Sequence, residues 1–539
     1  MTKTDSEAES RRERTRGGSS RVAAGILLSR LAGLARERAI AYFFGTSLYA
    51  DAWRAALRIP NVLQNLLGEG TLSASFIPVY AEMVEQGRHQ DARRFAGAAV
   101  GILAVVAGLA ALLGIALAPL LVTTFFAGFE PEQQALTVTL MRILFPMTAV
   151  LVLSAWALGI LNSHRRFFLS YSAPVLWNVT MITVLVAAGT VWAFPQLDLV
   201  TALAWAALAG GGAQLAVQLP SVLRLVGAVR PSLDLNTPGI REAIRNFGPV
   251  VAGRGVVNLS AWLDVALAAL LTTGAVAILG YAQTLYLLPI ALFGMAVAAS
   301  ELPELSRERE ADRAKVARHV SEALERVTYF VLPATLAYLA LGDQVVGGLY
   351  RTGEFGAQDT MLVHVVLAAY ALGMPASSGA RVLSSAYFAL RDTKTPARMA
   401  ILRVGVSLVV GASLMFPVGW MLDDLRFGAA GLGLGASVGA WLEYGLLRRR
   451  LSTYVGPHAP SREHLLKVGA AAVLAVAAGL LAKALLPEEL HPVLLAAGTL
   501  LPAGVLFLAF ARGFGLAFPM DVFRSTSEGR GAGGEGDRS

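Results

Sequence analysis

The chain has 539 residues, of which 55% are hydrophobic and only 15% are charged. Its mean hydropathy of +0.58 exceeds that of soluble globular proteins and indicates an integral membrane protein. The absence of cysteine excludes disulfides, thiol catalysis and cysteine-bound metal, and the seven histidines show no metal-ligand spacing. The net charge of +8 is better explained by topology signals between membrane spans than by nucleic-acid binding.

Apolar segments long enough to cross a bilayer recur along the chain after a basic head at 1–21, which is expected to stay in the cytoplasm. A crossing helix needs about 20 apolar residues. We therefore predict an all-α polytopic membrane protein with about fourteen transmembrane helices. The predicted spans are 22–46, 49–83, 96–123, 136–161, 168–194, 200–223, 246–271, 276–303, 322–342, 360–389, 397–420, 428–447, 466–486 and 492–511.

Basic residues favour one side of this predicted topology. If the head is cytoplasmic, every cytoplasmic connection is rich in Lys and Arg, as in "EQGRHQDARR" and "SREREADRAKVARH". The opposite connections carry only Arg351 and Arg426, with Lys483 at a boundary. This asymmetry supports fourteen spans with both termini inside, because a miscounted span would invert every later loop.

A weak internal repeat relates the two halves. Arg30 in the first span and Arg254 in the seventh both lie beside glycines, 224 residues apart, and two short basic connections at Asn162 and Arg391 lie 229 apart. The expected lobes have six spans each and the same orientation, a transporter-like arrangement. The predicted divisions are 22–224 for the N-lobe, 225–245 for a cytoplasmic linker, 246–450 for the C-lobe, 451–513 for spans thirteen and fourteen, and 514–539 for a disordered cytoplasmic tail.

The opening stretch "LSRLAGLARERAIAYFFG" places charges inside an apolar span. Arg30, Gly33 and Glu37 share one helix face at i, i+3 and i+7, whereas Arg36 points about 120° away from Arg30. An arginine at bilayer depth is costly and usually faces a protein interior or a water-filled cavity. Snorkelling to the nearer interface is the alternative for Arg36 and Arg38.

Polar residues in the second predicted span follow a heptad spacing. They form one stripe on a helix face, and Asp51 can pair with Arg54 at i, i+3. Arg58 has no carboxylate at i±3 or i±4 and is available for an anionic ligand, while Pro60 is expected to bend the helix. An interfacial amphipathic helix is the alternative. The stripe consists of Asp51, Arg54, Arg58, Asn61, Asn65, Gly68 and Ser75.

The second half contributes further polar residues at depth. Arg254 lies in the seventh predicted span, followed by Asp264, and Arg381 lies in the tenth among serines. Cations from both halves are expected to converge on a cavity suited to a phosphate or diphosphate. Asp264 is a candidate for binding a coupling cation, with pairing to Arg254 as the alternative. Trp177 with Asn178 is interpreted as packing or as an interface anchor.

Several long blocks resemble the MurJ (MviN) family of lipid II flippases in the multidrug, oligosaccharidyl-lipid and polysaccharide exporter superfamily. The blocks are "SRLAGLARERAIAYFFG", "ADAWRAALRIPNVLQNLLGEGTLSASFIPVYAE", "GYAQTLYLLPIALFGMAVAASELPELS", "LYRTGEFGAQDT" and "YFALRDTKTP". The resemblance implies transport of lipid-linked peptidoglycan precursor from the inner to the outer leaflet by alternating access of two six-helix lobes. It also implies that the last two spans form a groove for the lipid tail.

The resemblance assigns roles by position. It implies that Arg30, Arg36, Asp51 and Arg58 belong to a central cationic cavity for the diphosphate and sugar head. Structural motif residues are carried by the same blocks. They are Glu69, Gly70, Ser73, Phe76 and Pro78 in the "EGTLSASFIP" block, and Asp392 and Pro396 in the "RDTKTP" block.

Two departures from the family pattern affect the expected cavity. Gln64 and Asn65 stand where many members carry paired arginines, and Gln283 and Thr284 stand where many carry an Asp-Arg or Gln-Arg pair. We expect Arg54 and Arg254 to supply the missing cations. Because of these departures, a second possibility stays open, namely that the chain is a divergent family member that transports a different lipid-linked cargo.

Three functions remain in competition at this stage. Lipid II transport without a cofactor, driven by membrane potential or an ion gradient, is favoured because no GxxxxGK[ST] loop for ATP is present. Export of another lipid-linked oligosaccharide, a drug or a cation is the sibling reading. An enzyme acting on polyprenyl phosphates would need clustered carboxylates or metal ligands at one interface, which the short outer loops lack. Lipid II, membrane lipids, and cell-wall synthesis and division proteins are the expected partners, with no nucleic acid, and the bacterial cytoplasmic membrane is the expected location.

Overall fold

The computed structural model describes residues 25, 27–294, 313–487 and 489–519, with the side chains at 69, 249, 252–261 and 293–294 outside the description. Every regular element in these ranges is helical, which confirms the predicted all-α fold. The head at 1–21 and the tail beyond residue 519 lie outside the described residues.

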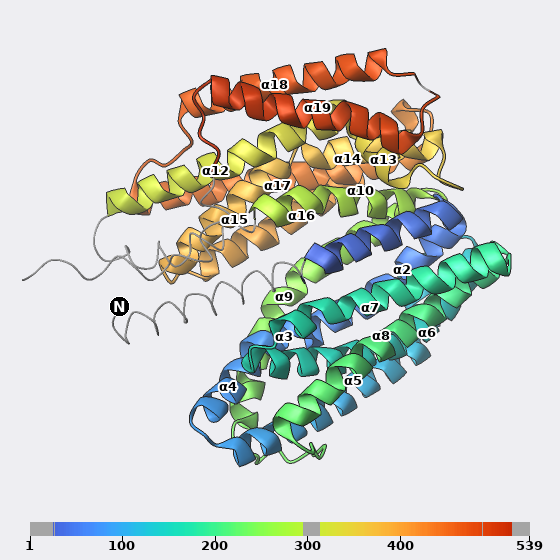
Figure 1. Cartoon of the computed structure of the whole chain (residues 1–539), viewed down its shortest axis with the longest axis vertical. Coiled ribbons are helices and arrows are strands. Elements are labelled where there is room, and N and C mark those ends of the chain that lie inside the picture. Colours follow the sequence, from blue (N-terminus) through green and yellow to red (C-terminus); the bar gives the residue numbers. More distant parts are fainter. Residues whose placement is uncertain (1–24, 26, 295–312, 488, 520–539) are drawn as a thin grey trace, which may run out of the picture. The chain divides into compact units, whose positions relative to one another are not determined.

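The described chain divides into two compact units. The first contains the described residues up to Ala277 together with Thr352–Phe355, and the second contains the described residues of Ile278–Arg351 and from Gly356 onward. The first unit has a helix at 27–44, then α2 (Leu48–Leu67), α3 (Glu69–Ser75), α4 (Ile77–Glu85), α5 (His89–Phe125), α6 (Pro131–Ser163), α7 (Phe167–Val186), the π-helix η1 (Ala187–Val191), α8 (Gln196–Val226), α9 (Ile240–Ala268) and the start of α10 (Ala275–Pro289) (Figure 1).

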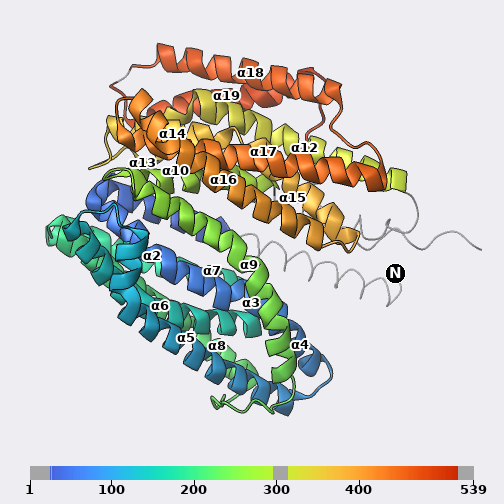
Figure 2. The ribbon, with the colours of Figure 1, turned by 180° about the vertical axis from the view of Figure 1, so that it is seen from behind.

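The second unit continues from α10 to the last described helix. Its elements are η2 (Ile290–Gly294), α12 (Arg313–Ala340), α13 (Gly342–Tyr350), α14 (Ala357–Ala371), α15 (Met374–Ala389), α16 (Lys394–Met421), η3 (Leu425–Phe427), α17 (Gly428–Val455), α18 (Arg462–Leu485) and α19 (Pro492–Gly513) (Figure 2).

Each of the fourteen predicted spans contains a helix or a broken helix. Among the described residues, eight helices are long and apolar enough to cross a membrane, or up to ten if each of two bent helix pairs counts as one span. The helix at 27–44 and α2 carry too many charges to be among the eight. The count of fourteen therefore stays a prediction.

The second predicted span is broken twice, whereas a single helix bent at Pro60 was expected. Pro60 lies inside α2, and the helix ends instead at Gly68, followed by α3 and α4. A Cβ at Gly68 would lie 2.4 Å from the carbonyl oxygen of Gln64, so only glycine fits this turn. The heptad stripe therefore does not continue along one straight helix to Ser75.

In the first unit, α6 is the central helix. It packs against α2, α5 and α8, and 72% of its most apolar window is buried, compared with 28% for α5. Phe145 on α6 fills the space over Gly114 of α5, where any Cβ would clash with the ring. Burial of this kind makes α6 the support for the helices that carry the charged residues.

In the second unit, α16 and α17 pack closely over a glycine face (Figure 2). Gly431, Gly435 and Gly439 recur every four residues on α17, and a Cβ at Gly435 would lie 2.5 Å from the backbone nitrogen of Gly411 on α16. Small residues at this spacing let two helix backbones approach within a membrane, where there is little hydrophobic drive between helices.

Matching turns in the two halves support the internal repeat. The glycines with positive φ include Gly45 and Gly274 and also Gly227 and Gly456, and each pair is 229 residues apart (274 − 45 and 456 − 227).

All four described non-glycine residues with positive φ pair in the same way. Arg165 and Arg391 are 226 apart (391 − 165), and Ala193 and Asp423 are 230 apart (423 − 193). The turns at Arg165 and Arg391 also share a hydrogen bond from the next residue's backbone nitrogen to a carbonyl five residues earlier, 2.8 Å and 2.9 Å long. The two halves therefore repeat one backbone plan.

Candidate functional site

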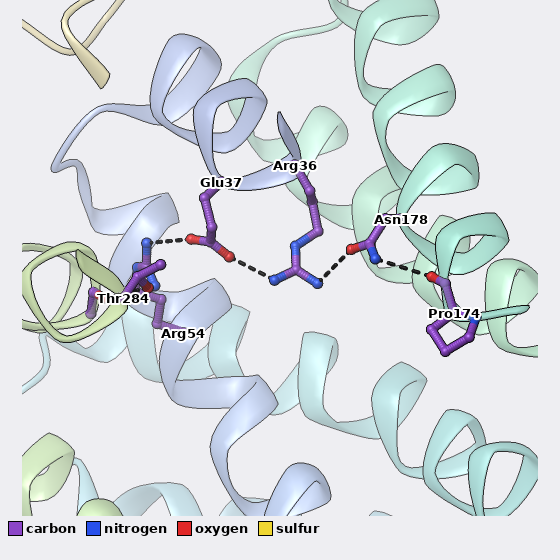
Figure 3. Close-up of polar contacts among 7 residues, drawn as sticks. Arg36, Glu37, Arg54, Pro174, Asn178 and Thr284 are labelled. Atoms are coloured by element: carbon purple, nitrogen blue, oxygen red, sulfur yellow. Dashed lines mark hydrogen bonds and ion pairs between the residues drawn. The ribbon is translucent and has the colours of Figure 1, made fainter. Parts of the chain in front are cut away.

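A charged network in the first unit joins the opening helix to α2 (Figure 3). The Glu37 carboxylate accepts from Arg36 Nη2 at 2.8 Å and from Arg54 Nη2 at 2.9 Å. The Glu37 side chain is 10% exposed, and those of Arg36 and Arg54 are 21% and 15% exposed. One carboxylate therefore holds two guanidinium groups, and the three residues together carry one surplus positive charge.

Residues of α7 hold the other side of Arg36. Its Nη1 donates to Asn178 Oδ1 at 3.0 Å, and its guanidinium carbon lies 5.1 Å from the centre of the Trp177 ring. Asn178 in turn donates to the Pro174 carbonyl (Figure 3). Trp177 Nε1 donates to the Ala207 carbonyl. The interpretation of Trp177 and Asn178 as mere packing or interface anchors was therefore incomplete, since both contact Arg36.

Asp51 has a different environment from the one expected of a cavity residue. It is fully buried, and its two carboxylate oxygens accept from the backbone nitrogens of Gly274 at 2.6 Å and Ala277 at 2.7 Å. Gly274 directly precedes α10, and Ala277 lies in its first turn. Backbone N–H groups at a helix start have no partner within the helix, and a carboxylate can satisfy them. The ion pair of Arg54 with Glu37 crosses between helices, whereas the sequence suggested pairing with Asp51 along α2.

Exposure increases along the rest of the α2 stripe. Arg58 and Asn61 are half-buried, and Asn65 is exposed. Pro60 is buried, and its carbonyl accepts from the Thr148 hydroxyl at 3.2 Å. The stripe therefore runs from the protein interior at Asp51 to an open surface at Asn65.

In the opening helix, Arg36 rather than Arg30 pairs with Glu37. Arg30 is exposed and Gly33 half-buried, although both share a predicted face with Glu37. Arg36, placed on a different face, reaches Glu37 instead. Helix periodicity alone missed this because a long guanidinium side chain can bend back toward an adjacent residue.

The "EGTLSASFIP" block forms α3 and the start of α4. Phe76 is 2% exposed and stacks against Tyr80 and Phe95, with ring centres 5.5 Å and 5.1 Å away. Ser73 and Pro78 are exposed, Gly70 is half-buried, and the Glu69 side chain lies outside the described residues. Phe76 thus anchors the broken segment to α5.

The residues predicted in the second half lie on different elements, and one of them, Arg381, is close enough to Arg403 and Glu443 to interact with them electrostatically. Arg381 on α15 is exposed and Asp264 on α9 is half-buried, while the side chain of Arg254 lies outside the description. Asp392 caps the start of α16, where it accepts from the backbone and hydroxyl of Thr395 at 2.9 Å and 2.6 Å. The hydrogen bond from the Thr395 hydroxyl is the largest cause that lowers the pKa of Asp392. Pro396 is buried in the same turn.

Sequence reasoning missed a second polar network, which joins α10, α15, α16 and α17. Arg403 Nη1 pairs with Glu443 at 2.9 Å, and its Nη2 donates to the Ser377 hydroxyl at 3.3 Å. Ser377 also shares a hydrogen bond of 2.9 Å with Tyr286. Opposite charges within two predicted spans, at Arg403 and Glu443, were the available signal.

An apolar groove lies between α12 and α19. Its volume is about 380 Å³, and aromatic residues of α12, Tyr329 and Phe330, face aliphatic residues of α19 such as Leu501 and Val505. Within the described ranges, no three His, Cys, Asp or Glu side chains come together as a metal site.

Known proteins share the sequence and fold of this chain. The profile of the family described as lipid II flippase MurJ matches residues 40–499. The chain belongs to the MurJ family. A lipid II flippase MurJ of Burkholderia cenocepacia is 35% identical over 462 residues, covering 83% of this chain and 86% of that protein. A probable lipid II flippase MurJ of Rhizobium tropici is 33% identical over 78% of each chain.

Solved structures confirm the fold. A lipid II flippase MurJ in an inward closed conformation matches with a TM-score of 0.75 at 22% identity, covering 92% of this chain and 98% of that one. An inward-facing multidrug resistance MATE family transporter matches with a TM-score of 0.64 at 16% identity, over 81% of this chain and 98% of that one. The MurJ family is a transporter family rather than a class of catalytic enzymes, and its members are membrane proteins, in line with the apolar helices here.

Proposed function

We propose that this chain is a lipid II flippase that moves the lipid-linked peptidoglycan precursor from the inner to the outer leaflet of the bacterial cytoplasmic membrane. The supporting observation is the Arg36 network, in which two arginines share one carboxylate within a MurJ family member. A diphosphate-linked lipid is the ligand that such a surplus of cationic donors suits.

Arg36 is the residue best prepared to bind the diphosphate. Its guanidinium has five N–H donors, and hydrogen bonds to Glu37 and Asn178 use two of them within the described chain. The remaining donors can bind phosphate oxygens without releasing either partner. Trp177 keeps the guanidinium plane oriented, which reduces the conformational entropy lost on binding.

The wider cavity is proposed to form between an N-lobe and a C-lobe of six spans each, which alternate in opening to the two sides. Arg30, Arg54 and Arg58 would line it from the first half, and Arg254 and Arg381 from the second. The apolar groove between α12 and α19 would take part of the polyprenyl tail, since its walls are aromatic and aliphatic. Cell-wall synthesis and division proteins are the expected partners.

The transport is proposed to be of the secondary type. The chain has no GxxxxGK[ST] loop for ATP, so membrane potential or an ion gradient would supply the energy. Asp264, half-buried on α9, is the candidate for binding a coupling cation.

Complementation tests this function. A bacterium depleted of its own flippase is supplied with the chain, and lipid II exposed on the outer leaflet is measured directly. We expect the intact chain to restore exposure, Arg36→Ala to abolish it, and Arg88→Ala, which removes an exposed arginine paired with Asp91, to leave it unchanged. Failure of the intact, membrane-inserted chain to expose lipid II would refute the proposal.

The orientation can be tested separately because the chain has no cysteine. Thr453→Cys, after the end of the basic run on α17, should react with a membrane-impermeant maleimide only from the cytoplasmic side. Asp423→Cys, in the turn before α17, should react only from the outside. Reversed labelling would refute cytoplasmic termini.

Export of another lipid-linked oligosaccharide is the second candidate. It is favoured by Gln64, Asn65 and Thr284, which stand where many MurJ proteins carry cations, and by half-buried Asn61 and exposed Asn65 near the open end of the stripe. Appearance of a different lipid-linked sugar in the outer leaflet, with no lipid II exposed there, would favour this candidate.

A further inference from the structure

A basic pocket lies at the end of α17 in the second unit, apart from the charged network of the first. Its volume is about 910 Å³, and it is bounded by α17, by α12 at Ser321 and by the loop after Gly456. Its lining includes Trp441, Tyr444, Gly445, Arg448, Arg449 and His458. The lining includes two arginines and no carboxylate.

The chemistry of the pocket changes along one face of α17. Trp441, Tyr444 and Arg448 lie at i, i+3 and i+7, so they follow the same face, and Trp441 is about 10 Å from Arg448 along the helix axis. Between them, Gly445 opens the helix surface, since no atom lies within 4 Å of a Cβ built there. An aromatic floor with cations at one end is the arrangement found at membrane–water interfaces.

The structure fixes one arginine and leaves the other available. Arg448 Nε donates to the His458 carbonyl at 3.1 Å, which restrains its guanidinium at the pocket lining. Within the described part of the chain, the Arg449 side chain makes no hydrogen bond or ion pair, and it is exposed. Together they present N–H donors suited to a phosphate group.

His458 adds a polar group of a different kind. It is 3% exposed, its Nδ1 lies 3.0 Å from the Gly456 carbonyl, and its Nε2 has no partner in the described chain. Because Nδ1 must donate to that carbonyl, Nε2 is an acceptor in the neutral ring, and burial lowers the pKa of His458, which favours the neutral form. The neutral ring therefore leaves the positive charge of the pocket to its arginines.

The internal repeat shows that the pocket is specific to the second half. At the 229-residue offset set by Gly227 and Gly456, the pocket positions correspond to Gly212 for Trp441, Leu219 for Arg448 and Pro220 for Arg449. In the first half, Arg93 of α5 instead donates to the Val226 carbonyl and covers Gly227. The basic and aromatic residues are therefore additions to the shared backbone plan rather than consequences of it.

We propose that this pocket binds the headgroup of an anionic glycerophospholipid, with the phosphate on Arg448 and Arg449 and the first acyl carbons over Gly445 beside Trp441 and Tyr444. Charge complementarity supports the phosphate, and the aromatic floor supports a lipid rather than a soluble phosphate compound. Phosphatidylglycerol, an anionic glycerophospholipid, is the probe for this class of ligand. In the orientation proposed above, the pocket faces the cytoplasmic leaflet, and only this leaflet assignment rests on the proposed function.

Native mass spectrometry of the full, delipidated chain in detergent tests the site, with phosphatidylglycerol as the probe and no lipid II present. We expect Arg448→Ala/Arg449→Ala to weaken the tightest phosphatidylglycerol adduct by about tenfold, as for loss of charge-assisted hydrogen bonds. The matched control Arg450→Ala/Arg462→Ala removes the same charge outside the pocket lining and should change binding by less than about twofold.

Two single variants test whether the effect is separate from folding, and a competition experiment tests the identity of the ligand. Arg449→Ala alone removes no hydrogen bond or ion pair within the described residues and should weaken binding without changing the melting temperature. Gly445→Leu fills the pocket without changing its charge and should weaken binding too. Inorganic phosphate at millimolar concentration should not displace the lipid. The proposal is overturned if the pocket and control pairs lose binding equally, if Arg449→Ala and Gly445→Leu both bind as the parent does, or if inorganic phosphate competes. Because transport is not measured, a failed flippase assay would leave this result unaffected.

Discussion

Arginines inside the predicted spans have different partners in the two units. In the first, Glu37 serves two arginines, Arg36 and Arg54, and the group keeps a surplus positive charge. In the second, Glu443 pairs directly with Arg403, Ser377 and Tyr286 add neutral hydrogen bonds, and Arg381 is close enough to interact electrostatically with both members of the pair. The direct pair of Arg403 and Glu443 fixes α16 to α17, whereas the two guanidinium groups that share Glu37 keep spare N–H donors for an anion.

This difference gives the two networks separate expected roles. Removing one partner of a buried pair is costly in both, because the other charge stays buried. Replacing a whole balanced pair by apolar residues is often neutral. A substitution in the Glu37 network should therefore lower both stability and transport. A substitution in the Arg403 network should lower stability and leave transport intact once stability is restored.

The largest effect is expected for Glu37→Gln. The change leaves Arg36 and Arg54 close together without their shared counter-charge and should lower the free energy of unfolding by about 3–5 kcal/mol. Thermal unfolding in detergent measures it, and Glu37→Gln/Arg54→Gln should recover part of the loss. An unchanged melting temperature for Glu37→Gln would contradict the role of Glu37 as a shared counter-ion.

Arg403→Leu should come next, with a loss of about 3 kcal/mol because Glu443 is left buried and unpaired. The double variant Arg403→Leu/Glu443→Leu should restore most of the melting temperature and retain transport in the complementation assay. If the double variant is stable but does not transport, the second network takes part in function and the contrast between the units fails.

Asn178→Ala should separate positioning from folding in the first unit. Loss of its hydrogen bond to Arg36 should cost only about 1 kcal/mol of stability, while transport falls about tenfold as Arg36 loses its fixed orientation. Thr180→Ala is the control, since Thr180 bonds only its own helix, at the Leu176 carbonyl. Equal transport by the two variants would show that Asn178 does not position Arg36.

The smallest effect is expected at the matched turns. Asp392 follows Arg391 in the second half, where the first half has Arg166 after Arg165. The pKa of Asp392 is lowered, so its contribution of about 1 kcal/mol is present at neutral pH and is lost as pH falls through its pKa in the folded protein. Asp392→Ala should lower the melting temperature at pH 7 and have less effect near pH 3. A loss that does not shrink with pH would contradict the charged cap.

The sequence was sufficient for the helical fold, the approximate places of the apolar segments and the internal repeat, because apolar length and turn spacing are local properties. It did not predict the breaks that divide 49–83 into α2, α3 and α4. It also predicted that Arg36, Glu37 and Arg54 matter. It did not predict their pairing, because Glu37 reaches Arg54 across helices rather than along one face.

Two other features depended on tertiary contacts. Asp51 was expected near an anionic ligand, yet it caps the approach to α10 more than 220 residues later in the chain. The Arg403 network was missed because no spacing rule links residues 40 positions apart on two helices. Only the close approach of α16 and α17 over glycines brings them together.

The left-handed turns at Arg165 and Arg391 have a further consequence. A left-handed conformation costs an L-residue with a side chain roughly 1 kcal/mol that glycine would avoid. Both halves nevertheless keep arginine there, in connections proposed to face the cytoplasm. The positive charges of these two residues would then oppose inversion of either half during membrane insertion. Each half would therefore contain its own signal for its orientation in the membrane.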